Sequence, residues 1–130
     1  MKHTILLIDD DPLILKTLQQ KLDGWEMEVF TAKSSEDAKQ ILERITPELV
    51  LLDLLLTKDD GSSGIMDYMD SRPDLKNIPL LVLTNLDKPE LRDMLLSRGV
   101  KEYLIKGSMS LDELHKKVMS YLEPAENSSR

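Results

Sequence analysis

The sequence contains no cysteine, which excludes disulfide bonds, thiolate metal sites and cysteine nucleophiles. It also has no long hydrophobic run, and the apolar segment after residues 1–4 is too short for a signal peptide or a membrane span. Basic residues are in deficit, with 17 Lys and Arg against 24 Asp and Glu and a net charge of −7. This balance argues against nucleic acid or an anionic membrane as the main partner. We therefore expect a cytoplasmic protein that binds cations or a basic protein surface.

A length of 130 residues, with 41% hydrophobic and 32% charged residues, is typical of one globular domain. Only the end of the chain departs from this composition, because residues 123–130 are polar and include a proline, which stops helices. We expect a single domain over residues 1–122 and a polar tail or linker over residues 123–130.

Five short apolar runs alternate with segments of helical spacing. They predict strands at residues 5–8, 27–30, 49–55, 80–83 and 103–105. The second run alternates like an edge strand, whereas the other four are typical of strands buried on both faces of a parallel sheet. This alternation predicts a doubly wound α/β fold with helices on both faces of the sheet. The common five-stranded form, (βα)5, has the strand order 2-1-3-4-5.

Several residues mark the ends of the helices. Ser34 and Ser110 begin capping-box patterns, which predict the starts of the second and fifth helices. Pro89 suits the first turn of the fourth helix, and Gly99 suits its end. The third helix is marked by apolar residues within 65–69.

Polar residues gather where the predicted strands end, which is the edge at which such sheets bind ligands. The first strand is followed by Asp9, Asp10 and Asp11, and Asp53 lies within the end of the third strand. The fourth strand ends at Thr84, and the fifth ends at Lys106. Because strands 1 and 3 are neighbours in this order, we expect Asp9, Asp10 and Asp53 to lie close together. Asp11 precedes Pro12 and suits the N-cap of the first helix instead.

Three clustered carboxylates repel one another, and one of them would have to take up a proton unless a cation intervenes. A set of oxygen ligands without His or Cys suits a hard cation, Mg²⁺ above all. A cation, the ammonium of Lys106 and the hydroxyl of Thr84 are together what the oxygens of a phosphoryl group need. Asp53 lies between apolar residues and is the best candidate for a nucleophile that forms an aspartyl phosphate.

With these residues in place, the sequence resembles the receiver domain of two-component response regulators, in the superfamily of the chemotaxis receiver. The matching motifs stand in the family's order at residues 5–11, 49–54, 78–84 and 103–106, and the resemblance covers residues 3–122. It implies a flavodoxin-like fold and phosphorelay signalling. A phosphoryl group would pass from a phosphohistidine of a sensor kinase or phosphotransfer protein to Asp53, in a reaction that depends on Mg²⁺.

The resemblance also assigns the metal site. Asp10 resembles the direct Mg²⁺ ligand, and Asp9 resembles the acidic residue that acts through water. Asp53 and the backbone carbonyl of Leu55 complete the protein ligands of the family.

Further roles follow from the resemblance. Lys106 resembles the lysine that pairs with the acceptor and later with the phosphoryl oxygens, and Thr84 resembles the switch hydroxyl. Tyr103 resembles the aromatic residue that swings inward, although ordinary packing explains it equally well. The fourth helix, fifth strand and fifth helix would bind a downstream protein, with a homodimer as a further outcome of phosphorylation. Such a domain is a phosphoacceptor switch and not an enzyme beyond self-phosphorylation and slow self-dephosphorylation.

Three departures from the family pattern stand out. Residues 56–57 read Leu-Thr where the family usually has Met-Pro, and either Gly61 or Gly64 could be the glycine of the loop that follows. Gly64 would imply a longer loop and a shorter third helix. Gly107 follows Lys106 in place of proline. Because a non-proline cis peptide costs about 2.5–4 kcal/mol, we expect a trans bond and a rearranged loop.

Two alternatives belong to other classes. The chain could be a degenerate receiver that binds a partner without phosphorylation. It could also be a phosphate hydrolase with an aspartate nucleophile, but such enzymes usually have a second Asp two residues later, and this sequence has Leu55 there.

Overall fold

The computed structural model describes residues 3–23, 27–56 and 60–123. In order, its elements are β1 (His3–Ile8), α1 (Pro12–Asp23), β2 (Met27–Ala32), α2 (Ser35–Leu42), β3 (Leu49–Leu52), α3 (Gly61–Asp70), β4 (Leu80–Thr84), α4 (Pro89–Ser97), β5 (Glu102–Ile105), the 3₁₀ turn η1 (Lys106–Ser108) and α5 (Leu111–Leu122). The strands form one parallel sheet in the order β2-β1-β3-β4-β5. The flavodoxin-like (βα)5 topology is therefore confirmed.

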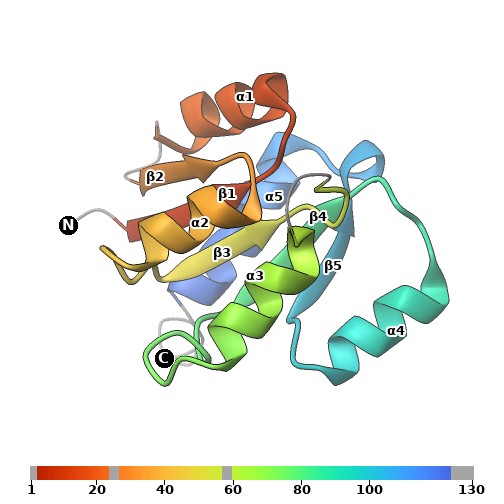
Figure 1. The fold of residues 1–130 in the computed structure, drawn as a ribbon. Coiled ribbons are helices and arrows are strands. Elements are labelled where there is room, and N and C mark those ends of the chain that lie inside the picture. The colour runs from red at the N-terminus through yellow and green to blue at the C-terminus, as the bar shows by residue number, and fades with distance from the viewer. Residues whose placement is uncertain (1–2, 24–26, 57–59, 124–130) are drawn as a thin grey trace, which may run out of the picture.

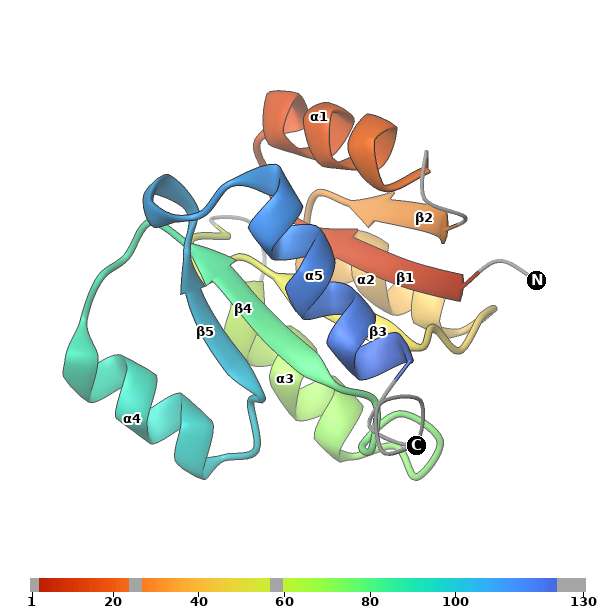
Figure 2. The same ribbon diagram turned by 180° about the vertical axis from the view of Figure 1, so that it is seen from behind.

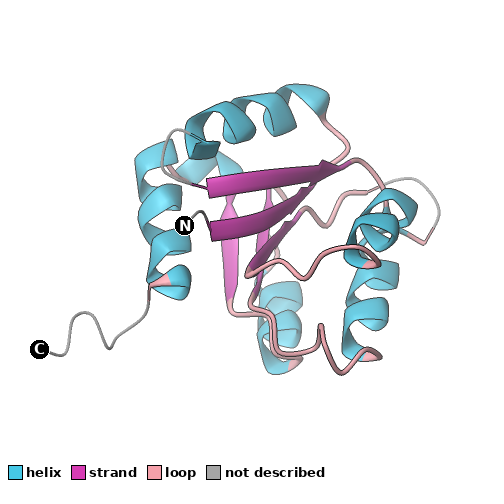
Figure 3. Cartoon of the chain, turned by 90° about the vertical axis from the view of Figure 1, so that its left-hand side faces the viewer, coloured by secondary structure: helices cyan, strands magenta, loops and turns pink. Residues whose placement is uncertain are grey.

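The sheet lies between two helical layers. Helices α1 and α5 cover one face, while α2 and α3 cover the other (Figures 1 and 2). Figure 3 shows the strands from the left of Figure 1, with helices on both sides of them. The layers follow from the alternation of side chains along a strand: Ile5 and Leu7 pack toward α1 and α5, whereas Leu6 and Ile8 pack toward α2 and α3.

Two strand predictions need correction. The run at residues 49–55 is a strand only from Leu49 to Leu52, so Asp53 follows the strand and does not lie within it. The last strand was expected to be buried on both faces, but only Leu104 of β5 is buried. The reason is that β5, like β2, lies at an edge of the sheet, where no further strand covers it.

The helix ends confirm the predicted caps. Ser34 Oγ accepts a hydrogen bond from the Asp37 amide, and Ser110 forms a reciprocal capping box with Glu113. Gly99 adopts a φ of 106° after α4, which a side chain would resist. Its amide donates to the Leu96 carbonyl oxygen in a Schellman-type ending.

The loop glycine is Gly61, because α3 begins there with a φ of 62°. Gly64 lies inside the helix, so the longer loop and shorter helix that it would imply are wrong. Residues 57–59 of this loop, and residues 124–130 of the predicted tail, lie outside the described residues. No helix in the described part of the chain is long and apolar enough to cross a bilayer.

Candidate active site

Three carboxylates meet at the carboxyl edge of the sheet, as the strand order predicts. The Asp9 amide donates to the Ala32 carbonyl oxygen, and the Asp53 amide donates to the Ile8 carbonyl oxygen, so both residues prolong the pairing of the strands before them. Asp9 is 5% exposed and Asp53 is 4% exposed, while Asp10 is half-buried. One carboxylate oxygen of each of the three lies within 4.8 Å of the others. At this spacing the three charges repel one another, and either a cation or proton uptake by one carboxylate relieves the repulsion.

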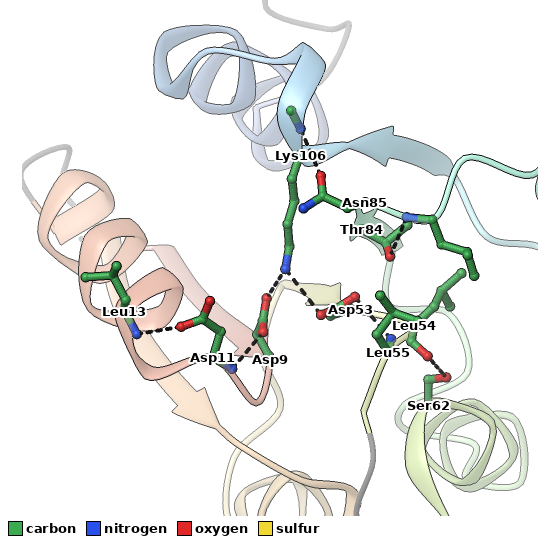
Figure 4. Close-up of polar contacts among 12 residues, drawn as sticks. Asp9, Asp11, Leu13, Asp53, Leu54, Leu55, Ser62, Thr84, Asn85 and Lys106 are labelled. Carbon is green, nitrogen blue, oxygen red and sulfur yellow. Dashed lines mark hydrogen bonds and ion pairs between the residues drawn. The ribbon is translucent and has the colours of Figure 1, made fainter.

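Lys106 supplies one positive charge to this group. Figure 4 shows its side chain reaching between two of the carboxylates, where Nζ lies 2.6 Å from Asp9 Oδ2 and 3.2 Å from Asp53 Oδ2. Burial alone would lower the pKa of Lys106, but its hydrogen bond to Asp9 and the charge of Asp53 outweigh burial and raise the pKa. Burial raises the pKa of Asp9, although the hydrogen bond from Lys106 opposes this shift. Lys106 contacts two of the three carboxyl groups, and a further cation would offset the excess of acidic groups at this site.

Asp53 is held at both oxygens. Oδ2 accepts from Lys106, and Oδ1 accepts from the backbone amide of Leu55 at 3.1 Å (Figure 4). This second bond places Leu55 directly beside Asp53. The role of the Leu55 carbonyl as a metal ligand stays a prediction.

Asp11 lies outside this group of three carboxylates, because its side chain caps α1. Asp11 Oδ1 accepts from the Leu13 amide at 3.0 Å, as an N-cap residue does, and the Asp11 amide donates to Asp9 Oδ1 at 2.9 Å (Figure 4). The N-cap prediction is therefore confirmed, and the same turn fixes the orientation of Asp9.

Thr84 and Tyr103 both contact Leu86, which follows β4. Thr84 is fully buried, and its Oγ1 accepts from the Leu86 amide at 3.3 Å. The Tyr103 hydroxyl donates to the Leu86 carbonyl oxygen, and burial raises the pKa of Tyr103. Both side chains thus hold the segment between β4 and α4, and their roles as switch residues stay predictions.

Comparison with known proteins identifies the family. Over residues 5–119 the sequence matches the family described as response regulator receiver domain. The chain belongs to this family. This match confirms the resemblance that the four motifs predicted. Receiver domains are phosphoacceptor switches of two-component signalling.

Curated relatives of this receiver domain are longer proteins. One is the "Probable transcriptional regulator ycf27" of Porphyridium aerugineum, with 32% identity over 128 residues, which are 98% of this chain and 51% of the relative. Another is the response regulator protein GraR of Staphylococcus epidermidis, with 28% identity over 102 residues, which are 78% of this chain and 44% of the relative. The receiver domain therefore spans about half the length of the curated relatives it matches.

Solved structures share its fold. The activated N-terminal receiver domain of RstA from Klebsiella pneumoniae has a TM-score of 0.82 and 25% identity, with 93% of this chain and 99% of that chain covered. A two-component response regulator from Clostridium difficile also has a TM-score of 0.82, with 23% identity and coverage of 93% and 96%. The second likeness concerns the fold alone.

One polar contact of this receiver domain was not predicted from the sequence. The Gly107 amide donates to Asn85 Oδ1 at 3.1 Å (Figure 4). The described residues contain no cis peptide bond, so the Lys106–Gly107 bond is trans as expected. The only signal in the sequence was the missing proline after Lys106, which leaves Gly107 with an amide hydrogen to donate.

Proposed function

We propose that this receiver domain accepts a phosphoryl group on Asp53 from a phosphohistidine of a sensor kinase or phosphotransfer protein. In this step an Asp53 oxygen forms a bond to phosphorus, while the bond from phosphorus to the histidine nitrogen breaks. The nitrogen leaves with the electron pair and takes up a proton. The observation that carries the proposal is the environment of Asp53, which is 4% exposed and whose oxygens are bonded to the Lys106 ammonium and the Leu55 amide.

The donor set fits Mg²⁺. All three side chains of the group offer carboxylate oxygens, which Mg²⁺ prefers, and no His or Cys belongs to the group. We propose that Asp10 and Asp53 bind the ion directly, that Asp9 binds it through water, and that the Leu55 carbonyl is a further ligand. When bound, the ion would neutralise charge on the phosphoryl oxygens.

The remaining site residues would respond to the modification. Lys106 already contacts Asp53 and would move its hydrogen bond to a phosphoryl oxygen. The Thr84 hydroxyl now accepts a hydrogen bond from Leu86 and keeps its own proton to donate to the phosphoryl group. A movement of Thr84 would loosen Leu86, and with it the hydrogen bond from Tyr103.

The output surface would be formed by α4, β5 and α5. Only Leu95 of α4 is buried, while Met94 and Leu96 are 48% and 40% exposed. Exposed apolar side chains on the helix nearest the moving segment suit a downstream protein, or a second copy of the domain after phosphorylation. We place this activity in the cytoplasm.

The test is to incubate the protein with Mg²⁺ and acetyl phosphate and to measure its intact mass. The parent should gain one stable phosphoryl group, and Asp53→Asn should gain none. Asp11→Asn is the matched control, because Asn is as good an N-cap as Asp, and it should gain the same mass as the parent. A parent that never gains mass would support the degenerate receiver, and steady phosphate release without a mass gain would support the hydrolase.

A further inference from the structure

The turn that carries Lys106 has few local restraints of its own. It is a single 3₁₀ turn, Lys106–Ser108, and the apolar Ile105 that precedes it provides no side-chain cap. Its middle residue is Gly107, and glycine has the greatest backbone freedom. In receiver domains a proline usually follows the lysine and restricts this backbone, but here that restriction is absent.

A hydrogen bond from another segment takes the place of this restriction. Asn85 directly follows Thr84 at the end of β4, and its Oδ1 accepts from the Gly107 amide at 3.1 Å. The two residues are 22 positions apart in sequence, so the bond joins the segment after β4 to the segment after β5. Proline at position 107 could not make this bond, because it has no amide hydrogen.

We propose that Asn85 is a positioning residue for phosphoryl transfer. Its side-chain oxygen fixes the turn at Gly107, and the turn fixes the backbone from which Lys106 reaches Asp9 and Asp53. This inference rests on the proposed function, because it assumes that Lys106 acts on Asp53 during transfer.

The orientation of the Asn85 amide also suggests a direct role in transfer, which the experiment has to distinguish from the positioning of Lys106. A backbone amide can only donate, so the atom that faces Gly107 must be the oxygen. The amide nitrogen then points elsewhere, and Figure 4 shows it on the side of the Lys106 chain. A hydrogen bond from this nitrogen to a phosphoryl oxygen would be a direct role that does not need Gly107.

Four variants distinguish these roles: Asn85→Ala, Gly107→Pro, the double variant and Gly107→Ala. Gly107→Pro removes the donor of the hydrogen bond. Gly107→Ala is the matched control, because it keeps the amide hydrogen, and a Cβ there would lie 3.7 Å from Asn85 Oδ1, an ordinary contact. For each variant, phosphorylation by acetyl phosphate is followed at saturating Mg²⁺ over a range of donor concentrations. Amide hydrogen exchange at residue 107 is measured by NMR wherever an amide hydrogen remains.

Asn85→Ala should lower the saturating rate about three- to tenfold, which is the effect expected from the loss of one neutral hydrogen bond. The donor concentration that gives half the saturating rate should not change, because Asn85 acts through Lys106 and does not bind the donor. Exchange of the Gly107 amide should become faster. Gly107→Ala should behave like the parent, and the double variant should be no slower than Gly107→Pro alone.

Three results would overturn the inference. One is unchanged amide exchange in Asn85→Ala, and another is a saturating rate of Asn85→Ala equal to that of the parent. The third is a double variant slower than Gly107→Pro, which would assign Asn85 the direct role. If Gly107→Pro does not fold, the rate and exchange of Asn85→Ala against Gly107→Ala still decide. A parent that takes up no phosphoryl group would contradict the proposed function, whereas the exchange measurement would still test the hydrogen bond.

Discussion

Replacing Lys106 by methionine should expose how strongly the acidic site depends on its cation. Asp9 and Asp53 would keep their buried positions but lose the ammonium that lies 2.6 Å and 3.2 Å from them. Removing one partner of a buried ion pair costs about 3–5 kcal/mol. The Lys106 side chain is 15% exposed and the carboxylates can take up protons, so we take a value at or below the bottom of this range, about 2–3 kcal/mol. For a domain of this size, each kcal/mol lowers the melting temperature by roughly 3–5 °C, which gives a loss of roughly 6–15 °C.

The same argument makes the loss depend on Mg²⁺. Without Lys106, Asp9 and Asp53 lose the ammonium that competes with Mg²⁺ for their oxygens, so added Mg²⁺ should bind more tightly and stabilise the variant more than the parent. We expect thermal unfolding at pH 7 to show the full loss in EDTA and less than half of it in saturating Mg²⁺. Lys101→Met is the control, because Lys101 is exposed just before β5, and it should melt like the parent in both buffers. An equal loss for Lys106→Met in EDTA and in Mg²⁺, or a loss no greater than that of the control, would refute this account of the site.

Three further predictions concern the metal, the lifetime of the modification and pH. Millimolar Mg²⁺ should raise the melting temperature of the parent, and Asp10→Asn should abolish the rise; a variant that gains as much as the parent would remove Asp10 from the metal site. Leu55, which is 47% exposed beside Asp53, and Leu86 offer no side-chain hydrogen bond to an attacking water. A Leu55→Asn, Leu86→Glu double variant should therefore lose its acyl phosphate faster, and equal decay rates would show that these leucines do not control water access. The hydrogen bond to Glu48 raises the pKa of His3, against the opposing effect of burial. Its stabilisation should be complete below about pH 6.5 and should disappear as the pH rises through the raised native pKa. Melting curves from pH 5.5 to 8.5 should show this loss in the parent, and a His3→Gln variant with the same pH profile would contradict it.

The topology and the grouping of the three carboxylates could be predicted from the sequence alone. Alternation of apolar runs with helical spacing predicts a parallel sheet, and right-handed crossovers cover both of its faces only if the winding direction reverses once. The order 2-1-3-4-5 was then predicted as the common five-stranded arrangement of this kind. That order then brought Asp9 and Asp53 together without any knowledge of coordinates. The helix caps at Ser110 and Asp11 could also be predicted from the sequence, because a cap involves residues only two or three positions apart.

Other features depend on contacts between segments that are distant in sequence. The end of β3 at Leu52 and the exposure of β5 depend on which neighbour is present beside each strand, which the apolar run alone does not encode. The choice of Gly61 over Gly64 depends on the φ of 62° at the start of α3.

The hydrogen bonds of the site were decided in the same way. Lys106 lies closer to Asp9 than to Asp53 across sequence separations of 97 and 53 residues, and the Asn85 side chain meets the Gly107 amide across 22. No local pattern specifies which of several nearby partners a side chain selects. That selection depends on how the loops at the carboxyl edge pack against one another, so it becomes visible only when the whole sheet is assembled.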